Sequence, residues 1–159
     1  MPADQPLTLG VDREGYDADP LLGFCFQLDI GEKVAGFFTE VSGVGSENDI
    51  VEQKISQKGK PIVRKVPGRL KWTDVSLKRG ITAKLDIWEW RQKVIDGKLK
   101  DARTTVTIHM LNREYKPVAE WTFVNAWPSK VTGPTFKSDS NEFGVEEVTI
   151  VHEGMYRVK

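Results

Sequence analysis

Apolar and polar side chains alternate near the start of the chain in a way that is typical of a β-strand with one buried face. The alternation is carried by Leu22, Phe24, Phe26, Leu28 and Ile30. Gly31 and Glu32 follow as a turn, and a second apolar run extends over Val34–Val44. The pattern therefore predicts a β-hairpin whose second strand ends at the glycines Gly43 and Gly45.

The stretch over Ser46–Lys60 is polar and charged and holds few large apolar residues. It is longer than an ordinary hairpin connection, and connections of such length are commonly functional. We expect a projecting loop or a two-stranded arm. After it, the pattern predicts a short strand over Ile62–Val66, a turn at Pro67 and Gly68, and another strand over Leu70–Lys78.

One helix is predicted between Ala83 and Ile95, because apolar residues recur there at helical spacing. Thr82 suits the N-cap position, and Gly97 suits the end of the helix. The predicted apolar stripe consists of Leu85, Trp88, Arg91 or Gln92, Ile95 and Leu99.

The second half of the chain reads as further strands. Thr104–Leu111 is rich in β-branched residues, which favour strands, and we expect two more strands over Val118–Trp127 and Phe143–His152. Pro128 is expected to interrupt or bend the strand before it. About seven or eight strands with one flanking helix, and no regular strand–helix alternation, predict a mainly β protein built as a sandwich or barrel.

Length and charge limit the classes of function. The 159 residues favour one domain, which we place at residues 19–159 after an irregular N-terminal arm over residues 1–18. Lys and Arg total 23, as do Asp and Glu. The chain as a whole therefore has no field that would attract nucleic acid or an anionic membrane.

The sequence near Met1 lacks the basic start and apolar run of a secretory signal, so we expect synthesis in the cytosol. No stretch approaches the roughly 18 apolar residues that a membrane helix needs. Cys25 is the single cysteine, so it has no disulfide partner in the chain. Its place in an alternating strand predicts a packed side chain instead of a nucleophile.

Candidate catalytic residues are few. His109 and His152 are the two histidines, and each lies in a predicted strand without a catalytic motif around it, so we expect structural or surface roles. Glu153 follows His152, but neighbouring strand residues point to opposite faces and form no dyad by proximity. We predict that the protein is not an enzyme.

No metal or cofactor is predicted. One cysteine and two distant histidines give no zinc spacing, and the calcium-loop likeness that starts at Asp139 fails at Phe143 and Ile150, where ligands are required. Gly43 and Gly45 lack the third glycine and the helix of a dinucleotide-binding fingerprint.

The five tryptophans leave open a second function, that of a small β-barrel whose aromatic side chains stack on the bases of single-stranded nucleic acid. Core or interface packing is the favoured interpretation, with Trp90 as the expected exception because it lies off the stripe of Leu85 and Trp88. The neutral charge balance also argues against nucleic-acid binding.

Several motifs in one order resemble the tail tube proteins of contractile phages and phage-tail-like injection systems. The resemblance covers residues from about 19 to the end and rests on Asp19–Phe26, Val34–Val44, Val63–Arg69, Leu77–Gly80, Trp88–Trp90, Asn125–Lys130, Ser140–Glu142 and His152–Gly154.

The resemblance implies a β-sandwich with one flanking helix whose strands join a ring-wide barrel in a hexamer. Stacked rings would form a hollow tube that sheath contraction drives through a target envelope. The stretch over Ser46–Lys60 corresponds in position to the segment that contacts the neighbouring subunit or ring. The expected contact residues are Glu47, Asp49, Glu52, Lys54, Lys58 and Lys60.

The implied partners are further copies of the chain, a sheath protein, and baseplate and tail-terminator proteins, with an effector protein or phage DNA as cargo in the lumen. The implied location is a phage tail or phage-tail-like particle, made in the bacterial cytoplasm and in some systems released from the cell. A tube-initiating paralogue at the baseplate is an alternative within the same family.

Overall fold

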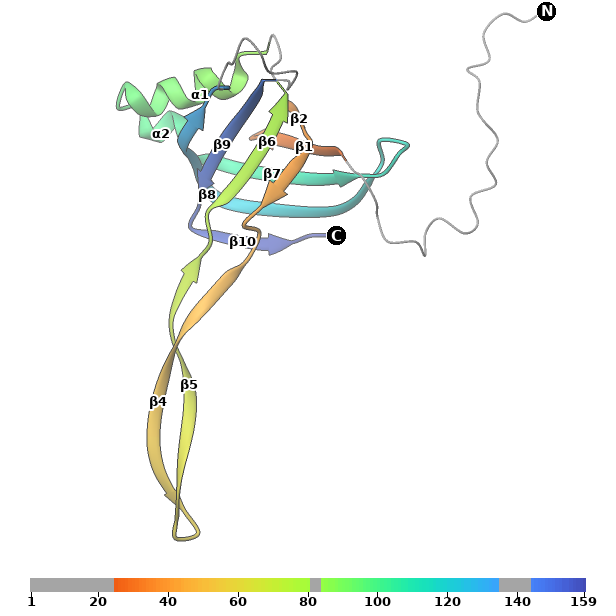
Figure 1. Ribbon diagram of the computed structural model, residues 1–159. Coiled ribbons are helices and arrows are strands. Elements are labelled where there is room, and N and C mark those ends of the chain that lie inside the picture. The colour runs from red at the N-terminus through yellow and green to blue at the C-terminus, as the bar shows by residue number, and fades with distance from the viewer. Residues whose placement is uncertain (1–24, 81–83, 135–143) are drawn as a thin grey trace, which may run out of the picture.

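Ten strands and two short helices lie within residues 25–80, 84–134 and 144–159, the part of the chain that this computed structural model describes (Figure 1). The strands are β1 (Cys25–Ile30), β2 (Lys33–Phe38), β3 (Glu40–Ser42), β4 (Ser46–Gln57), β5 (Lys60–Trp72), β6 (Val75–Gly80), β7 (Thr104–Leu111), β8 (Pro117–Thr132), β9 (Val145–Val151) and β10 (Gly154–Arg157). The helices are α1 (Asp86–Ile95) and α2 (Leu99–Ala102).

Eight of these strands form one antiparallel sheet in the order β2-β1-β7-β8-β9-β6-β3, with β10 paired to β8 beside this path. The other two, β4 and β5, pair only with each other. In Figure 1 the eight-stranded sheet forms the body of the molecule, and β4 and β5 extend from it as a long twisted ribbon. We refer to Ser46–Trp72 as the β4–β5 ribbon.

The sheet folds over itself because β8 belongs to both of its halves. The first part of β8 pairs with β7 and β10, and its last residues pair with β9. The partner changes near Asn125, which has a positive φ of 50°, and Pro128, where the register with β9 shifts. As a result, β6 and β9 cross over β1 and β7 (Figure 1), which is a sandwich arrangement.

The core lies between the two halves of the sheet. Alternate residues of β7 and β9 are buried, including Val106 and Ile108 on one layer and Val148 and Ile150 on the other. They pack in one hydrophobic cluster, because the two-residue period of a strand sends every second side chain inward. The expected mainly β sandwich is therefore present.

Helix α1 covers one end of this sandwich, but with a different face from the predicted one. Ile87 and Trp90 are buried, while Leu85 and Ile95 of the predicted stripe are about 60% exposed. Trp90 donates a hydrogen bond to the carbonyl of Ala102 at 2.7 Å, so the expectation that it lies outside the core was wrong. The packed spacing is one residue out of step with the predicted stripe.

Of the two predicted ends of this helix, only the C-terminal one agrees with the structure. Leu85 occupies the N-cap position without a side-chain hydrogen bond, so Thr82, which lies outside the described residues, is not the N-cap. Gly97 does end the helix, with a positive φ of 78° and an amide bonded to the carbonyl of Val94. The short helix α2 follows and was not predicted.

Several strands differ from the sequence-based expectation. The run Val34–Val44 is divided between β2, which pairs with β1 as predicted, and β3, which pairs with β6 instead. Pro67 and Gly68 lie inside the continuous strand β5 and make no turn. The strand predicted over Ile62–Val66 is therefore the middle of β5, and the one predicted over Leu70–Lys78 is divided between the end of β5 and β6. The chain turns instead at Lys58 and Gly59.

The end of the chain adds a strand that was not predicted. After β9, residues Gly154–Arg157 pair with Val124–Trp121 as β10. Strand β8 also continues past Pro128 to Thr132, so the proline bends the strand without ending it. The N-terminal arm expected at residues 1–18 lies outside the described residues.

Candidate assembly surface

The β4–β5 ribbon projects from the body with both of its faces open. Its 12 and 13 residues pair antiparallel from Ser46 and Trp72 at the base to Gln57 and Lys60 at the tip. At the tip, Lys58 and Gly59 both adopt positive φ values of 51° and 75°, as a tight two-residue hairpin turn requires. The ribbon is the two-stranded arm that the sequence allowed.

The base of the ribbon is fixed to the body by close backbone contacts. Gly43 has a φ of +81°, and a Cβ at this residue would lie 2.0 Å from the carbonyl oxygen of Asp74. On the other side, His152 places its Nε2 3.1 Å from the carbonyl of Thr73 and its ring 5.8 Å from that of Trp72. These contacts hold the ribbon at a set position relative to β9 and β10.

A bulge interrupts the ribbon at about one third of its length. The register shifts between Asn48 and Ile50, which face Leu70 and Pro67 respectively. Asn48 donates its side-chain amide to the carbonyl of Gly68 at 3.3 Å, and a shallow hollow of about 250 Å³ opens beside it. The bulge accommodates Pro67, which cannot donate to the strand ladder.

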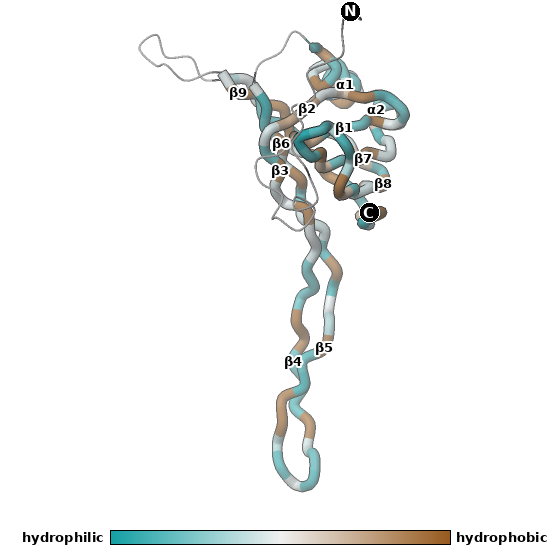
Figure 2. Tube along the Cα trace, turned by 90° about the vertical axis from the view of Figure 1, so that its right-hand side faces the viewer, coloured by the Kyte–Doolittle hydropathy of each residue, from teal (hydrophilic) through white to brown (hydrophobic). Residues whose placement is uncertain are grey.

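Both faces of the ribbon carry exposed apolar residues. The pairs Val51–Val66 and Ile55–Ile62 share one face, while Ile50–Pro67 and the pair of Lys54 with Val63 share the other. Ile50 is 66% exposed and Val63 55% exposed. Figure 2 shows apolar and polar segments alternating along the ribbon and a polar tip. Such exposure on a narrow projection is typical of a surface that another chain covers.

The structure places all six predicted contact residues on this ribbon. Glu47 lies opposite Lys71 near the base, but Lys71 forms its ion pair with Asp49 at 2.8 Å. Glu52 lies opposite Lys65 in the middle. The remaining three occupy the outer half or the turn and are Lys54, Lys58 and Lys60.

Sequence reasoning missed two basic residues of the same surface. Arg64 and Lys65 lie on β5 opposite Gln53 and Glu52 and are exposed. They fall in the short strand predicted over Ile62–Val66, which was read as separate from the projecting segment. The alternation of charged with apolar residues on a segment that follows a turn was the signal for the second strand of a ribbon.

The eight-stranded sheet also leaves edges free within the described residues. Strands β2 and β3 end the order of the sheet, and β10 has β8 as its single partner. Open edges present unpaired backbone groups, and proteins either block them or use them for assembly. Exposed apolar side chains accompany two of these edges: Val34 and Phe37 on β2, and Tyr156 on β10.

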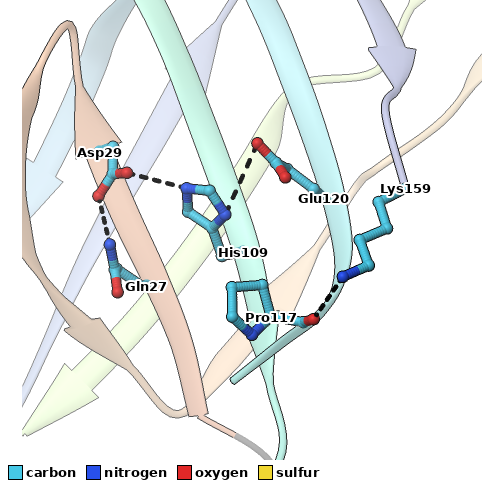
Figure 3. Close-up of polar contacts among 6 residues, drawn as sticks. All are labelled: Gln27, Asp29, His109, Pro117, Glu120 and Lys159. Carbon is cyan, nitrogen blue, oxygen red and sulfur yellow. Dashed lines mark hydrogen bonds and ion pairs between the residues drawn. The ribbon is translucent and has the colours of Figure 1, made fainter. Parts of the chain in front are cut away.

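His109 lies within a group of polar residues on one face of the sheet (Figure 3). Its Nε2 is 2.8 Å from Asp29 Oδ2 on β1, and its Nδ1 is 3.7 Å from Glu120 Oε1 on β8. Gln27 donates a hydrogen bond to the second oxygen of Asp29 at 2.8 Å. These contacts join the three strands β1, β7 and β8.

His152 is used at the base of the ribbon. Its two nitrogens face the carbonyl oxygens of Thr73 and Gly154 at 3.1 Å, and its ring packs edge-on against Phe123 at 4.9 Å. Both histidines therefore make contacts that join elements of the fold. Among the described residues, no group of three His, Cys, Asp or Glu side chains could hold a metal ion.

The described helices include none that is long and apolar enough to cross a membrane. Cys25 lies at the start of β1 and is partly buried. Burial raises the pKa of its thiol above the ordinary value of 9.0, so the thiol is the prevailing form at neutral pH. A protonated thiol is a poor nucleophile, which agrees with the packed role predicted for this residue.

Comparison with known proteins assigns the chain to a class, the tail tube proteins. The sequence matches the family described as T4-like virus tail tube protein gp19 over residues 22–156. This chain belongs to that tail tube family, which confirms the resemblance drawn from its motifs. It is a tail tube protein by family, and it shares its fold with a chain of a contractile injection system.

Solved structures with the same fold come from such particles. A chain of the sheath-tube complex of the extracellular contractile injection system PVC, in the extended state, has a TM-score of 0.72 and 23% identity over 87% of this chain and 90% of that chain. A chain of the anti-feeding prophage tube terminating cap has a TM-score of 0.69 and 22% identity over 87% and 91%.

The fold also has a more distant similarity to a protein named Hcp1. Hcp1 from Flavobacterium johnsoniae matches with a TM-score of 0.52 and 15% identity over 85% of this chain and 95% of that chain. No curated protein matches the chain by sequence. Nothing in these comparisons supports the nucleic-acid-binding alternative, and four of the five tryptophans are buried or partly buried.

Proposed function

We propose that this tube protein forms hexameric rings that stack into a hollow conduit, and that a contracting sheath drives this conduit through a target envelope. The protein acts by assembly and without catalysis. Membership of the tail tube family and the likeness of the fold to chains of a sheath-tube complex and a tube terminating cap support this proposal.

The β4–β5 ribbon is the observation that carries the proposal. A two-stranded hairpin without further support is marginally stable in water, yet this ribbon extends over 12 and 13 residues and exposes Ile50 and Val63. A second copy of the chain can bury these exposed residues, because a stacked ring presents the same surface at regular intervals. The ribbon then lies against the neighbouring subunit or the next ring.

The charged residues of the ribbon set the register of this contact. We propose inter-subunit contacts for Glu47, Asp49, Glu52, Lys54, Lys58 and Lys60. Exposed ion pairs contribute about 0–1 kcal/mol each, so their effect is complementarity more than affinity. Apolar burial at Ile50, Val51 and Val63 supplies the larger share of the binding free energy.

The open edges of the eight-stranded sheet support closure of the ring. If β2 or β10 pairs with a strand of the adjacent subunit, the backbone groups of that edge are satisfied. Six such sheets joined in a ring form a closed barrel around a lumen. The further partners that we propose are a sheath protein, baseplate and terminator proteins, and an effector protein or DNA as cargo.

Charge reversal at the tip of the ribbon tests the proposal. The variant Lys58→Glu/Lys60→Glu should lower the fraction of the protein that assembles, while Lys98→Glu/Lys100→Glu, on exposed residues beside α2, should not. Size-exclusion chromatography with light scattering should give about 108 kDa for a ring, six times the 18.0 kDa of one chain. A wild-type protein that remains at 18.0 kDa at every concentration, alone and with baseplate proteins, would contradict the proposal.

A further inference from the structure

The charge of this neutral chain is distributed unevenly. The β4–β5 ribbon, residues 46–72, has seven basic and three acidic residues. The excess is concentrated in the outer half, where one acidic residue, Glu52, accompanies five basic residues. These are Lys54, Lys58, Lys60, Arg64 and Lys65.

None of these five basic side chains has a carboxylate within ion-pair distance among the described residues. All five are exposed. They lie beside exposed apolar residues, since Val63 faces Lys54 across the ribbon and Ile62 precedes Val63. The outer half is therefore a basic and partly apolar surface that the body leaves uncovered.

The complementary acidic stretch of the chain is at its N-terminal end. Residues 1–24 contain five acidic residues and one basic residue, Arg13. The acidic residues are Asp4, Asp12, Glu14, Asp17 and Asp19, and Leu7, Leu9, Val11 and Tyr16 are interspersed with them. Outside this stretch and the ribbon, the described residues hold 13 acidic and 14 basic residues, so the body has no comparable acidic excess.

We propose that residues 1–24 bind along the outer half of the β4–β5 ribbon of the same chain while the subunit is unassembled. The excess of four negative charges in residues 1–24 matches the excess of four positive charges in the outer half of the ribbon. Electrostatic complementarity of this kind guides association and fixes register. The leucines and Tyr16 of the acidic stretch cover the apolar residues between the basic ones.

The length of the stretch permits this contact within one chain. An extended segment of 24 residues reaches about 80 Å, and a ribbon strand of 12 residues is about 40 Å long. A tethered segment binds at an effective concentration in the millimolar range, so the contact within one chain prevails over contact between dilute copies. The inference concerns the unassembled chain, and its test is separate from that of tube assembly.

Hydrogen exchange of the full chain in its monomeric fraction tests the contact. In low salt, amides of residues 52–65 should exchange about two- to tenfold more slowly than in the variant Asp12→Asn/Glu14→Gln/Asp17→Asn/Asp19→Asn. The control variant Glu32→Gln/Asp74→Asn/Glu89→Gln/Asp101→Asn neutralises four exposed acidic residues of the body and should match the wild type. Equal exchange in all three proteins would overturn the inference.

Carbodiimide cross-linking then shows whether the acidic residues that contact a ribbon belong to the same chain or to another copy. An equal mixture of unlabelled and ¹⁵N-labelled protein should give cross-links from residues 12–19 to Lys54, Lys58, Lys60 or Lys65 within one copy, and their yield should fall as salt is raised. Contact between copies would instead place about half of the cross-links between a labelled and an unlabelled copy, the proportion for random pairing in an equal mixture, and this result would overturn the binding within one chain. The absence of any such cross-link would overturn the contact itself.

Discussion

The indole Nε1 of Trp88 donates a hydrogen bond to Glu146 Oε1 at 3.0 Å, and this bond fastens α1 to β9. The other carboxylate oxygen lies 3.1 Å from Arg79 Nε, an ion pair in which both side chains are almost fully buried. Arg79 also lies over the ring of Phe38, with 5.0 Å between its Cζ and the ring centroid. Glu146 therefore joins the helix, two strands and the core at one point.

Loss of this carboxylate should destabilise the fold more than loss of the indole. Glu146→Gln leaves the buried Arg79 without its counter-charge, and breaking a buried pair costs about 3–5 kcal/mol. Trp88→Phe removes one hydrogen bond to a charged group from a partly exposed side chain, at about 1–2 kcal/mol. Urea unfolding followed by circular dichroism measures both changes, and equal losses in the two variants would contradict this assignment.

Two glycines, Gly43 beside the base of the ribbon and Gly59 at its tip, should respond differently to alanine. Gly43 and Gly59 both have positive φ, but a Cβ at Gly43 would meet the carbonyl of Asp74 whereas Gly59 has open space around it. Gly59→Ala should cost about 1–2 kcal/mol, the strain of a left-handed residue with a side chain. Gly43→Ala should cost more and displace the base of the ribbon. Thermal unfolding compares the two, and similar shifts would show that the contact at Gly43 is not tight.

Charges placed on the apolar residues of the ribbon should impair assembly without unfolding the subunit. Ile50→Lys and Val63→Lys replace exposed side chains, so the free energy of unfolding of the monomer should change by less than about 0.5 kcal/mol. Tyr115→Lys, on an equally exposed residue outside the ribbon, is the control. Sedimentation velocity should show fewer rings for each of the two ribbon variants than for the wild type, and as many rings for Tyr115→Lys as for the wild type. Assembly at wild-type levels would exclude the ribbon from the contact.

Cys25 should react slowly with thiol reagents at neutral pH. Burial raises the pKa of its thiol above 9.0, and the thiolate is the reactive form. The alkylation rate should therefore still be rising with pH beyond pH 9, and the midpoint of its pH profile should lie above that of a small free thiol measured alongside. The pH profile of iodoacetamide labelling, read by mass spectrometry, provides the measurement. A plateau below pH 8 would indicate an activated cysteine.

The elements that the sequence predicted well are those in which one local pattern decides the structure. The bounds of β7 were predicted to the residue, since β-branched residues fill its first five positions and buried Val106 and Ile108 alternate there with less buried neighbours. The hairpin of β1 and β2 followed from alternation and from Gly31, whose φ is +63°. In these segments propensity, periodicity and burial agree.

The elements that were missed depend on contacts between distant residues. Two apolar stripes one residue apart exist on α1, and packing against β8 and α2 selects the one with Ile87 and Trp90. Pro67 and Gly68 are a turn signal in isolation, but the bulge opposite Asn48 accommodates them within β5. The six predicted contact residues all lie on the ribbon, whereas Arg64 and Lys65 were left out because they fall in the short strand predicted over Ile62–Val66.

Negative-stain electron microscopy of the purified full chain, alone and with candidate baseplate proteins, tests the central claim most directly. The account predicts rings or hollow tubes with sixfold end views, and fewer of them for Lys58→Glu/Lys60→Glu than for Lys98→Glu/Lys100→Glu. Particles without a central channel, or single subunits under every condition, would contradict the assignment of this chain as a stacking tube subunit.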